Sequence, residues 1–162
     1  MRWNKLAEQR FPMTAEGKKK LEQQLDDLKM KKRPEIIERI KVARGFGDLS
    51  ENSEYTSAKD EQSSVESKIS EIENQLQYAD VINLDKVDQN EVSVGKTVTF
   101  QEDDDDPESY QIVGEAESDP DDGKISNVSP IGKSLIGKKV GDSVDIKTPG
   151  GSFTVKITKV SE

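Results

Sequence analysis

The residues best suited to chemistry gather in one short stretch, 45–55. Asp48 and Glu51 lie three positions apart, after two glycines and directly before a helical pattern, and Glu54 follows them. Carboxylate oxygens are the hard ligands that Mg²⁺ prefers, usually together with water and phosphate oxygens. An ion held there would activate a water and neutralise charge during an in-line attack on a phosphodiester. Two carboxylates make only half of such a site, so the remaining ligands must come from a partner into which this stretch is inserted.

The same two carboxylates also fit a structural role. An Asp-x-x-Glu sequence before a helix is the pattern of a capping box, in which Asp48 accepts from the backbone and Glu51 reaches back. Taken alone, this spacing favours the cap. Three features favour chemistry: the turn is expected at the tip of an extended arm, Leu49 has little core to enter, and a cap needs only one carboxylate. The sequence does not decide whether Glu54 contributes to the chemistry at the tip.

Basic side chains flank this turn on both sides. Lys41, Arg44 and Lys59 fall within a few helical turns of it, where they could hold an RNA backbone by point-charge contacts. Ordinary solvation of a helix surface is the alternative for each of them. Aromatic residues do not alternate with them, so base stacking and sequence-specific recognition are not expected.

Composition restricts the remaining possibilities. The chain has 162 residues, of which 31% are hydrophobic and 35% charged, and it has no cysteine and no histidine. Disulfides, thiolate chemistry, imidazole metal sites and Ser-His catalysis are therefore excluded. The sequence shows neither a signal peptide nor a stretch long enough to span a bilayer, so we expect a cytoplasmic protein. The net charge of −9 argues against general coating of nucleic acid.

Helical periodicity places the turn between two helices. Apolar residues recur at spacings of three and four from Leu21 to Ala43, and again from Tyr55 to Ala79 with a polar interruption at Gln62. Two such seams joined by a short turn predict an antiparallel coiled coil, an arm of about 40 Å at about 1.5 Å per residue. Thr14 is the expected N-cap, and Pro34 predicts a bend or short break near 32–34. Residues 17–44 are mainly basic and 45–84 mainly acidic.

After residue 91 the period changes from helical to two. Strands are expected at 92–100, 110–113, 124–128, 143–147 and 153–160, and a short helix at 129–137 with Ser129 as cap and Pro130 at its first position. The acidic run 102–106 lacks the ligand spacing of a calcium loop and is expected to be a solvated hairpin loop. The prediction is an α+β chain: a helical hairpin followed by a small antiparallel sheet with one helix on a face.

Several motifs, in both halves and in order, resemble bacterial transcript cleavage factors of the Gre family, GreA type. The resemblance covers 13–160, and its most specific segment is the turn, Gly-Asp-Leu-Ser-Glu-Asn-Ser-Glu-Tyr at 47–55. Further matches are Met13-Thr14, Arg33-Pro34-Glu35-Ile36, the segment 129–138 and the segment 146–151.

The resemblance implies a coiled-coil hairpin at 13–84, a linker at 85–91 and an FKBP-like domain at 92–162. Residues 1–12 are an addition of unknown role, since members of the family normally begin near Met13. A fold does not carry an activity, so peptidyl-prolyl isomerisation is not predicted. The implied partner is bacterial RNA polymerase, whose secondary channel receives the hairpin. The implied function is stimulation of the polymerase's own cleavage of backtracked RNA, without enzymatic activity of the factor itself.

The family's functional residues match positions of this sequence. Two acidic tip residues match Asp48 and Glu51, which would hold Mg²⁺ jointly with the polymerase and not tightly in the isolated protein. Basic residues that contact the RNA 3′ segment match Arg44 and Lys59, with Lys41 nearby.

Ser129 and Pro130 match the surface that docks at the channel rim, and we expect a monomer. The tip lacks the extra aspartates of a related anti-cleavage subgroup, which favours a cleavage stimulator. The alternatives are a regulator that occupies the channel without promoting cleavage and a plain coiled-coil interaction module.

Overall fold

The computed structural model describes residues 10–48 and 50–162, and the chain divides into two compact units. One unit is the helical segment Lys19–Tyr78, and the other joins the start of the chain through Lys18 to Ala79–Glu162. The prediction of an N-terminal extension falls mostly on residues 1–9, which lie outside the described part. The domain boundaries expected at 84/85 and 91/92 stay predictions. Within the described ranges, no helix is both long enough and apolar enough to cross a membrane.

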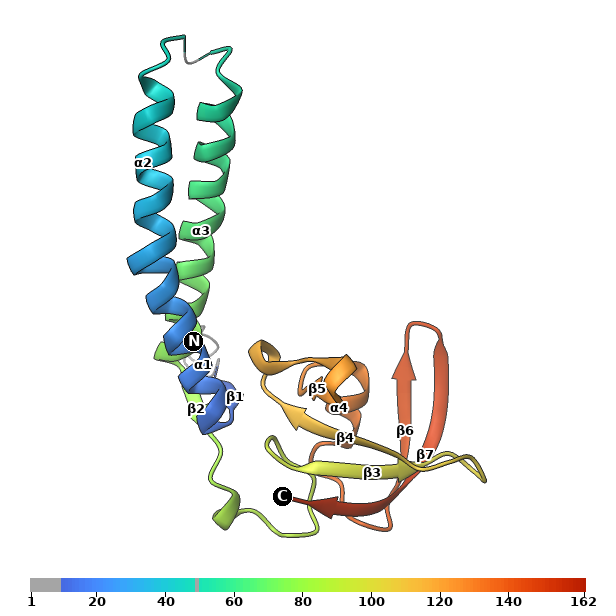
Figure 1. Ribbon diagram of the computed structural model, residues 1–162. Coiled ribbons are helices and arrows are strands. Elements are labelled where there is room, and N and C mark those ends of the chain that lie inside the picture. Colours follow the sequence, from blue (N-terminus) through green and yellow to red (C-terminus); the bar gives the residue numbers. More distant parts are fainter. Residues whose placement is uncertain (1–9, 49) are drawn as a thin grey trace, which may run out of the picture. The chain divides into compact units, whose positions relative to one another are not determined.

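The helical unit is an antiparallel hairpin, as predicted. Its helices are α1 (Ala15–Asp27), which begins in the other unit, α2 (Arg33–Arg44) and α3 (Ser53–Gln77), and α2 and α3 lie side by side (Figure 1). The expected seams supply its core, because the buried apolar side chains of α2 and α3 are those at three-and-four spacing: Ile36, Ile40, Ala43, Ala58, Val65, Ile69 and Ile72. Gln75 is buried as well, which the apolar pattern did not indicate.

The helix does not break before Pro34. A π-helical turn, Leu28–Lys32, joins α1 to α2, and the N–H of Arg33 donates to the carbonyl of Leu28, five residues back. Proline lacks an N–H and its ring crowds the carbonyl four residues earlier, so a wider turn accommodates it. Pro34 itself is the second residue of α2, directly after this wider turn.

Ion pairs across the hairpin explain the uneven charge of its two arms. Lys32 lies 2.8 Å from Glu61, and Arg33 lies 2.7 Å from Glu66 with a second bond from the same guanidinium at 2.8 Å. Lys29 with Glu73 and Arg39 with Glu61 complete the set. The basic arm therefore faces the acidic arm, and the pairing favours this register of the two helices.

The second unit contains a five-stranded sheet in the order β5-β4-β3-β7-β6. Its strands, shown in Figure 1, are β3 (Thr97–Gln101), β4 (Glu108–Val113), β5 (Lys124–Ser126), β6 (Ser143–Thr148) and β7 (Gly151–Ser161). The helix α4 (Pro130–Leu135) buries Leu135 in the same core as Val98, Ile112, Ile146 and Ile157. Each expected strand and the short helix is present, so the α+β class is confirmed.

Two details of the predicted sheet are wrong. It is not wholly antiparallel, because β5 pairs with β4 in parallel, with Ile112 opposite Ile125. The first strand begins at Thr97 and not near 92, although Val92 and Val94 are buried in the core. Burial of a β-branched residue outside a strand produces the same sequence signal as a strand. The acidic run 102–106 is the β3–β4 loop, as expected.

A short parallel ladder joins distant parts of the chain and was not predicted. Strand β1 (Phe11–Met13) pairs with β2 (Ala79–Val81), with Pro12 opposite Asp80. The helical seam was expected to continue to Ala79, but α3 ends at Gln77. Three residues are too few to show a period of two, so only tertiary pairing reveals these strands.

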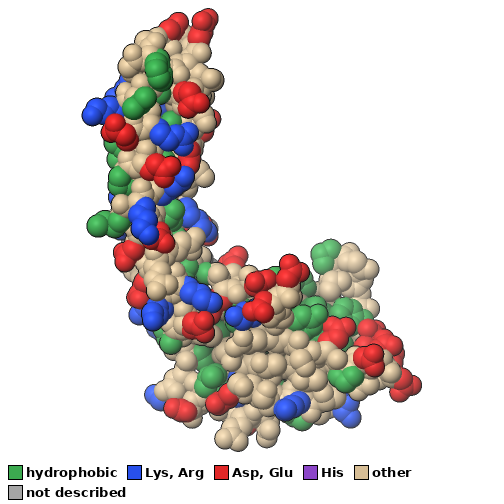
Figure 2. All heavy atoms as spheres, viewed as in Figure 1, with side chains coloured by type: hydrophobic (Ala, Val, Ile, Leu, Met, Phe, Trp, Pro, Cys, Tyr) green, Lys and Arg blue, Asp and Glu red, His purple; other side chains and the backbone are tan. Residues whose placement is uncertain are grey.

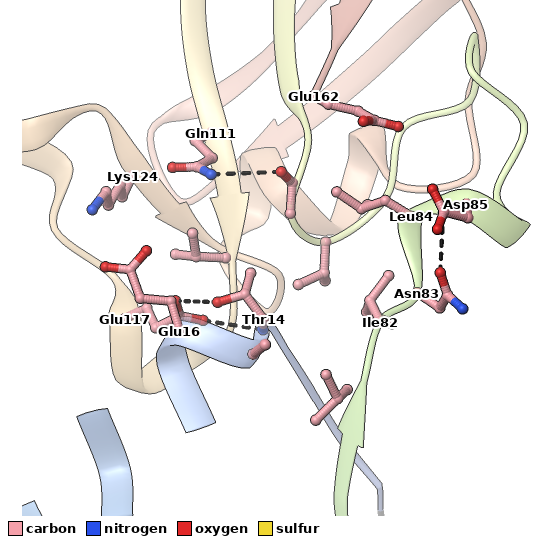
Figure 3. Close-up of a pocket in the computed structure, with 15 residues that line it drawn as sticks. Thr14, Glu16, Ile82, Asn83, Leu84, Asp85, Gln111, Glu117, Lys124 and Glu162 are labelled. Atoms are coloured by element: carbon pink, nitrogen blue, oxygen red, sulfur yellow. Dashed lines mark hydrogen bonds between the residues drawn. The ribbon is translucent and has the colours of Figure 1, made fainter. Parts of the chain in front are cut away.

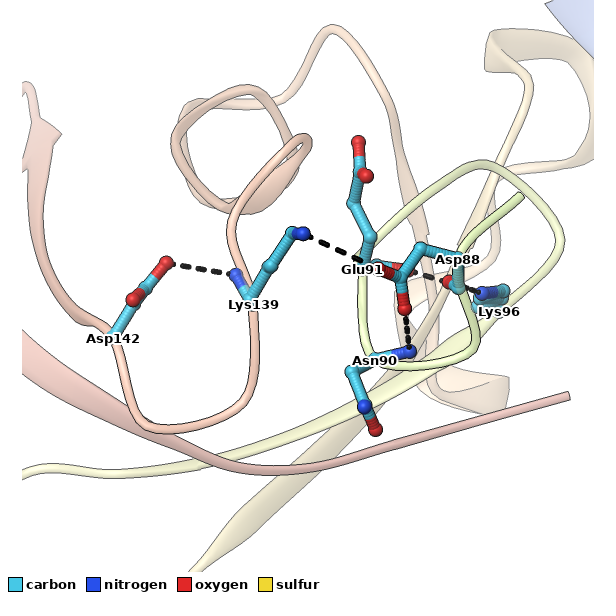
Figure 4. Close-up of polar contacts among 6 residues, drawn as sticks. All are labelled: Asp88, Asn90, Glu91, Lys96, Lys139 and Asp142. Atoms are coloured by element: carbon cyan, nitrogen blue, oxygen red, sulfur yellow. Dashed lines mark hydrogen bonds and ion pairs between the residues drawn. The ribbon is translucent and has the colours of Figure 1, made fainter.

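The segment expected to be a linker is attached to the sheet unit through a buried lysine. Lys96 is fully buried, and its Nζ donates to the carbonyl oxygens of Asp88 at 2.5 Å and Glu91 at 3.1 Å (Figure 4). The Asp88 carboxylate accepts from the N–H of Asn90 at 2.9 Å and from Lys139 at 3.2 Å. These contacts lower the pKa of Asp88, first through the Asn90 N–H and then through Lys139.

The start of α1 is capped within the same unit. Thr14 is the N-cap, as predicted, because its Oγ1 accepts from the N–H of Gly17 at 3.0 Å. The Thr14 hydroxyl donates in turn to Glu117 at 2.5 Å. Both residues line a cleft of about 650 Å³ that Gln111 and Lys124 also border (Figure 3). The Glu117 carboxylate is therefore used to hold the helix start.

Candidate functional site

The turn between α2 and α3 is a tight reversal built on backbone hydrogen bonds. After Arg44, the N–H of Gly45 donates to Val42 at 3.0 Å, and the N–H of Gly47 donates to Arg44 at 3.3 Å. Gly47 has φ of 100°, a left-handed conformation that a side chain disfavours. Residues 45–48 and 50–52 form what we call the tip, and acidic side chains cover that end of the hairpin (Figure 2).

The cap of α3 is neither of the carboxylates proposed for a capping box. Asn52 is the N-cap, and its Oδ1 accepts from the N–H of Tyr55 at 3.1 Å. Its Nδ2 donates to the carbonyl of Ala43, the last core residue of α2, at 2.7 Å. The capping-box interpretation is therefore wrong, and Asp48 and Glu51 are not needed to start the helix. Asparagine is a preferred N-cap and stands directly before the helical pattern, so the sequence carried that signal.

Asp48 is exposed and organised by its own turn. Its Oδ1 accepts from the hydroxyl of Ser50 at 2.8 Å and from the N–H of Ser50 at 3.1 Å. These bonds lower the pKa of Asp48, first through the Ser50 hydroxyl and then through the backbone N–H, with a smaller contribution from the N–H of Glu51. Both of the Ser50 bonds go to Oδ1 of Asp48, and neither goes to Oδ2.

Glu51 is exposed, and across 10–48 and 50–162 its side chain makes no hydrogen bond or ion pair. The same part of the chain contains no group of three or more acidic, histidine or cysteine side chains able to enclose a metal ion. The carboxylate oxygens of Asp48 and Glu51 are the kind of ligand that Mg²⁺ prefers, but two carboxylates are too few to fill its octahedral coordination. The tip fits a metal that another molecule also holds, and it does not fit a complete site of its own.

The structure brings the three predicted basic residues together. Lys41 and Arg44 from α2 and Lys59 from α3 border one hollow near the tip, with Ile37, Ile40 and Gln62. The guanidinium of Arg44 lies 5.9 Å from the centre of the Tyr55 ring, and Lys59 donates to Gln62 at 3.0 Å. The polar interruption of the seam at Gln62 thus orients a lysine. Tyr55, which holds Arg44 by a cation–π contact, was expected only as a core residue.

Glu54 belongs to a different face of the hairpin. It borders an apolar groove formed mainly by Val42 and Phe46, and the basic hollow contains none of these three residues. The chain therefore presents the two carboxylates of the tip, a basic hollow and an apolar groove as separate surfaces.

The predicted docking residues lie in the sheet unit, at the start of α4. The Ser129 Oγ accepts from the N–H of Gly132 at 3.1 Å and donates to the carbonyl of Ser126 at 2.7 Å, so its role as cap is confirmed. Pro130 is the first residue of the helix and is exposed, as is Val128. The hydroxyl is used inside the unit, and what Ser129 and Pro130 contribute to docking stays a prediction.

Comparison with solved structures finds proteins of similar length and low sequence identity. A Thermus thermophilus protein described as GreA factor homolog 1 is 26% identical, covers 95% of this chain and 100% of its own, and superposes with a TM-score of 0.45. A GreA/GreB factor from Nitrosomonas europaea is 19% identical, with a TM-score of 0.43. These scores carry no argument about function.

Sequence comparison is far more specific. A family model described as "Transcription elongation factor, N-terminal" matches residues 11–81, and one described as "Transcription elongation factor, GreA/GreB, C-term" matches 87–162. A transcription elongation factor GreA of Limosilactobacillus fermentum is 62% identical over 94% of this chain and 98% of its own. One from Streptococcus pneumoniae is 56% identical over 97% and 99%. The chain therefore belongs to the GreA/GreB family of transcription elongation factors.

Proposed function

We propose that the hairpin enters the secondary channel of bacterial RNA polymerase and stimulates the polymerase's own cleavage of backtracked RNA, so that arrested complexes resume elongation. The observation that carries this proposal is that the residue that caps α3 and the two exposed carboxylates of the tip are different residues. Asn52 caps α3, so neither Asp48 nor Glu51 is needed as the cap, and both carboxylates are exposed. Asp48 is oriented only by the neighbouring Ser50, and the described residues give Glu51 no hydrogen-bond partner.

Asp48 and Glu51 would supply oxygen ligands to a catalytic ion that the polymerase also holds. Mg²⁺ bound there would polarise the attacking water and offset the charge that develops on the phosphodiester. Ser50 fixes one oxygen of Asp48 and lowers the pKa of this carboxyl group, and both of its bonds go to the same oxygen. Because two carboxylates bind Mg²⁺ weakly, the isolated factor does not hold the ion tightly.

Two other surfaces serve positioning in this proposal. The hollow of Lys41, Arg44 and Lys59 holds the backbone of the RNA 3′ segment by charge, without reading its bases. Ser129 and Pro130 contact the rim of the channel. In this proposal the factor works as a monomer in the cytoplasm, and the polymerase is the enzyme, because Asp48 and Glu51 supply only part of a metal site.

Cleavage by a stalled elongation complex tests the proposal. Asp48→Asn and Glu51→Gln keep the shape of each side chain and remove its charge, and each is expected to lower the cleavage rate at saturating factor by roughly 100-fold, as loss of one charged stabilising group does. Glu71→Gln, which changes an exposed carboxylate of α3 outside the tip, the basic hollow and the apolar groove, is the control and leaves the rate unchanged.

Binding measured on the same complexes completes the test. Both variants are expected to compete with the unaltered factor for polymerase at the normal concentration. If they bind and still cleave at the normal rate, the shared-metal proposal is wrong. If the unaltered factor binds polymerase but does not stimulate cleavage, the correct function is that of a regulator that occupies the channel without promoting cleavage.

A further inference from the structure

Two large apolar side chains lie exposed beside the tip. Phe46 is 74% exposed and Val42 is 52% exposed; Val42 lies in the last turn of α2, and Phe46 follows two residues after the helix ends. Together with Ala43 they form the floor of the groove described above. Figure 2 shows hydrophobic side chains on the surface of the hairpin close to its acidic end.

The hairpin does not need these side chains for its own stability. The core of the hairpin is made of Ile36, Ile40 and the residues of α3 that face them, and neither Val42 nor Phe46 is part of it. Single exposed apolar residues are normal on a protein surface, but adjoining ones that form a groove mark a contact with another molecule.

Charge around the groove indicates what that molecule is. Its border carries Glu35, Glu38 and Glu54, and its one cation, Arg39, is already paired with Glu61. In the described part of the chain, Glu38 and Glu54 have no ion-pair partner. Such a border repels the phosphates of RNA and attracts lysine or arginine. An apolar floor with an acidic border therefore suits a protein segment in which an apolar side chain is flanked by basic ones.

We propose that this groove is a docking site for a basic, apolar segment of RNA polymerase close to its active centre. The inference rests on the proposed function and deepens it, because it assigns attachment of the hairpin to polymerase to a surface that does not include Asp48 or Glu51. Phe46 and Val42 supply contact area, and Glu38 supplies charge complementarity. In this proposal the groove binds polymerase, and the two carboxylates of the tip take part in cleavage.

Equilibrium competition for stalled elongation complexes tests the proposal without relying on cleavage. The probe is a fluorescently labelled, full-length copy of this protein. Phe46→Ser and Val42→Ser are each expected to raise the concentration needed for half-displacement about tenfold, the effect of removing one central interface side chain. Phe46→Leu restores most of the affinity, because it keeps an apolar side chain in the groove.

A matched control separates the groove from apolar surface in general. Met30 is 76% exposed on the same arm and lies outside the groove, so Met30→Ser is expected to leave binding unchanged. Glu38→Lys weakens binding and Glu38→Gln does so less, in both cases with less effect at high salt. Circular dichroism should show an unchanged melting temperature for all of these surface variants.

A photo-crosslinker at position 46 identifies the occupant. Attachment to a polymerase peptide with lysine or arginine near the reacting side chain supports the proposal. Attachment to RNA or to a second copy of this chain, or Phe46→Ser binding as well as Met30→Ser, overturns it. Asp48→Asn distinguishes the two proposals: if it leaves cleavage intact the shared-metal function fails, while the competition result still decides the groove.

Discussion

Asn52 closes the tip by joining two helices: its Nδ2 donates to the carbonyl of Ala43 at 2.7 Å, while its Oδ1 accepts from the N–H of Tyr55 at 3.1 Å. One side chain thus bonds to a C-terminal carbonyl of α2, which also accepts from the N–H of Phe46 at 3.2 Å, and to an N-terminal N–H of α3. This frees every carboxylate of the turn from that task. The first prediction follows from it.

Asn52→Ala removes both bonds and is expected to destabilise the protein by about 1–2 kcal/mol, the usual effect of losing an N-cap together with a second hydrogen bond. Asn52→Asp retains the acceptor and loses the donor, so it should recover only part of that loss. Urea unfolding followed by circular dichroism measures both. Asn74→Ala, an exposed asparagine of the same helix, is the control. An equal effect of Asn52→Ala and Asn74→Ala would show that the bridge contributes nothing.

The ionisation of Asp48 is expected to depend on Ser50. The folded pKa of Asp48 lies below its ordinary value because the Ser50 hydroxyl and N–H donate to it. The turn is therefore stabilised fully above the ordinary value, and this stabilisation is lost as the pH falls through the lowered value. An NMR titration should place the Asp48 midpoint below that of a model aspartate. Ser50→Ala should move it upward, and a midpoint that does not move contradicts the hydrogen-bond assignment.

The ion pairs between the arms are expected to be sensitive to salt and acid. The pKa of Glu61 is lowered, first by Lys32 and then by Arg39, so its contribution is present above the ordinary glutamate value and lost as the pH falls through the lowered one. Glu61→Gln should reduce the melting temperature slightly at low salt and not at high salt, because exposed pairs are screened. Glu71→Gln breaks only a pair within α3 and should have a smaller effect. Equal effects at both salt concentrations would rule out an electrostatic origin.

Lys96 is expected to stabilise the sheet unit far more than any surface lysine. Its buried side chain donates to the carbonyls of Asp88 and Glu91, and Lys96→Met removes both bonds, although the Asp88 carbonyl keeps the N–H of Glu91 as a donor. We expect a loss of about 2–4 kcal/mol, since hydrogen bonds to charged groups and unsatisfied buried carbonyls each cost this order of energy. Urea unfolding checks this, with Lys156→Met, on the exposed face of β7, as control. A loss no larger than that of the control would mean that water replaces the ammonium.

The sequence by itself determined the elements whose signal is local. The two helical seams, the strands, the cap at Thr14 and the helix start at Ser129 are each written in spacing and residue type within a few turns, so the α+β class and the position of the tip could be predicted. The motifs in both halves of the chain likewise indicated the family. These features depend on neighbours in the chain, which a sequence displays directly.

Only the tertiary structure decided the features that join distant residues. The β1–β2 ladder, the parallel pairing of β5 with β4 and the attachment of Asp88 and Glu91 to Lys96 leave no periodic signal, because each contact is made once and across the fold. The tip shows the same limit. Spacing favoured Asp48 as the cap, and only the fold brought Asn52 within reach of Ala43, so that one amide could serve both helices and leave the carboxylates free.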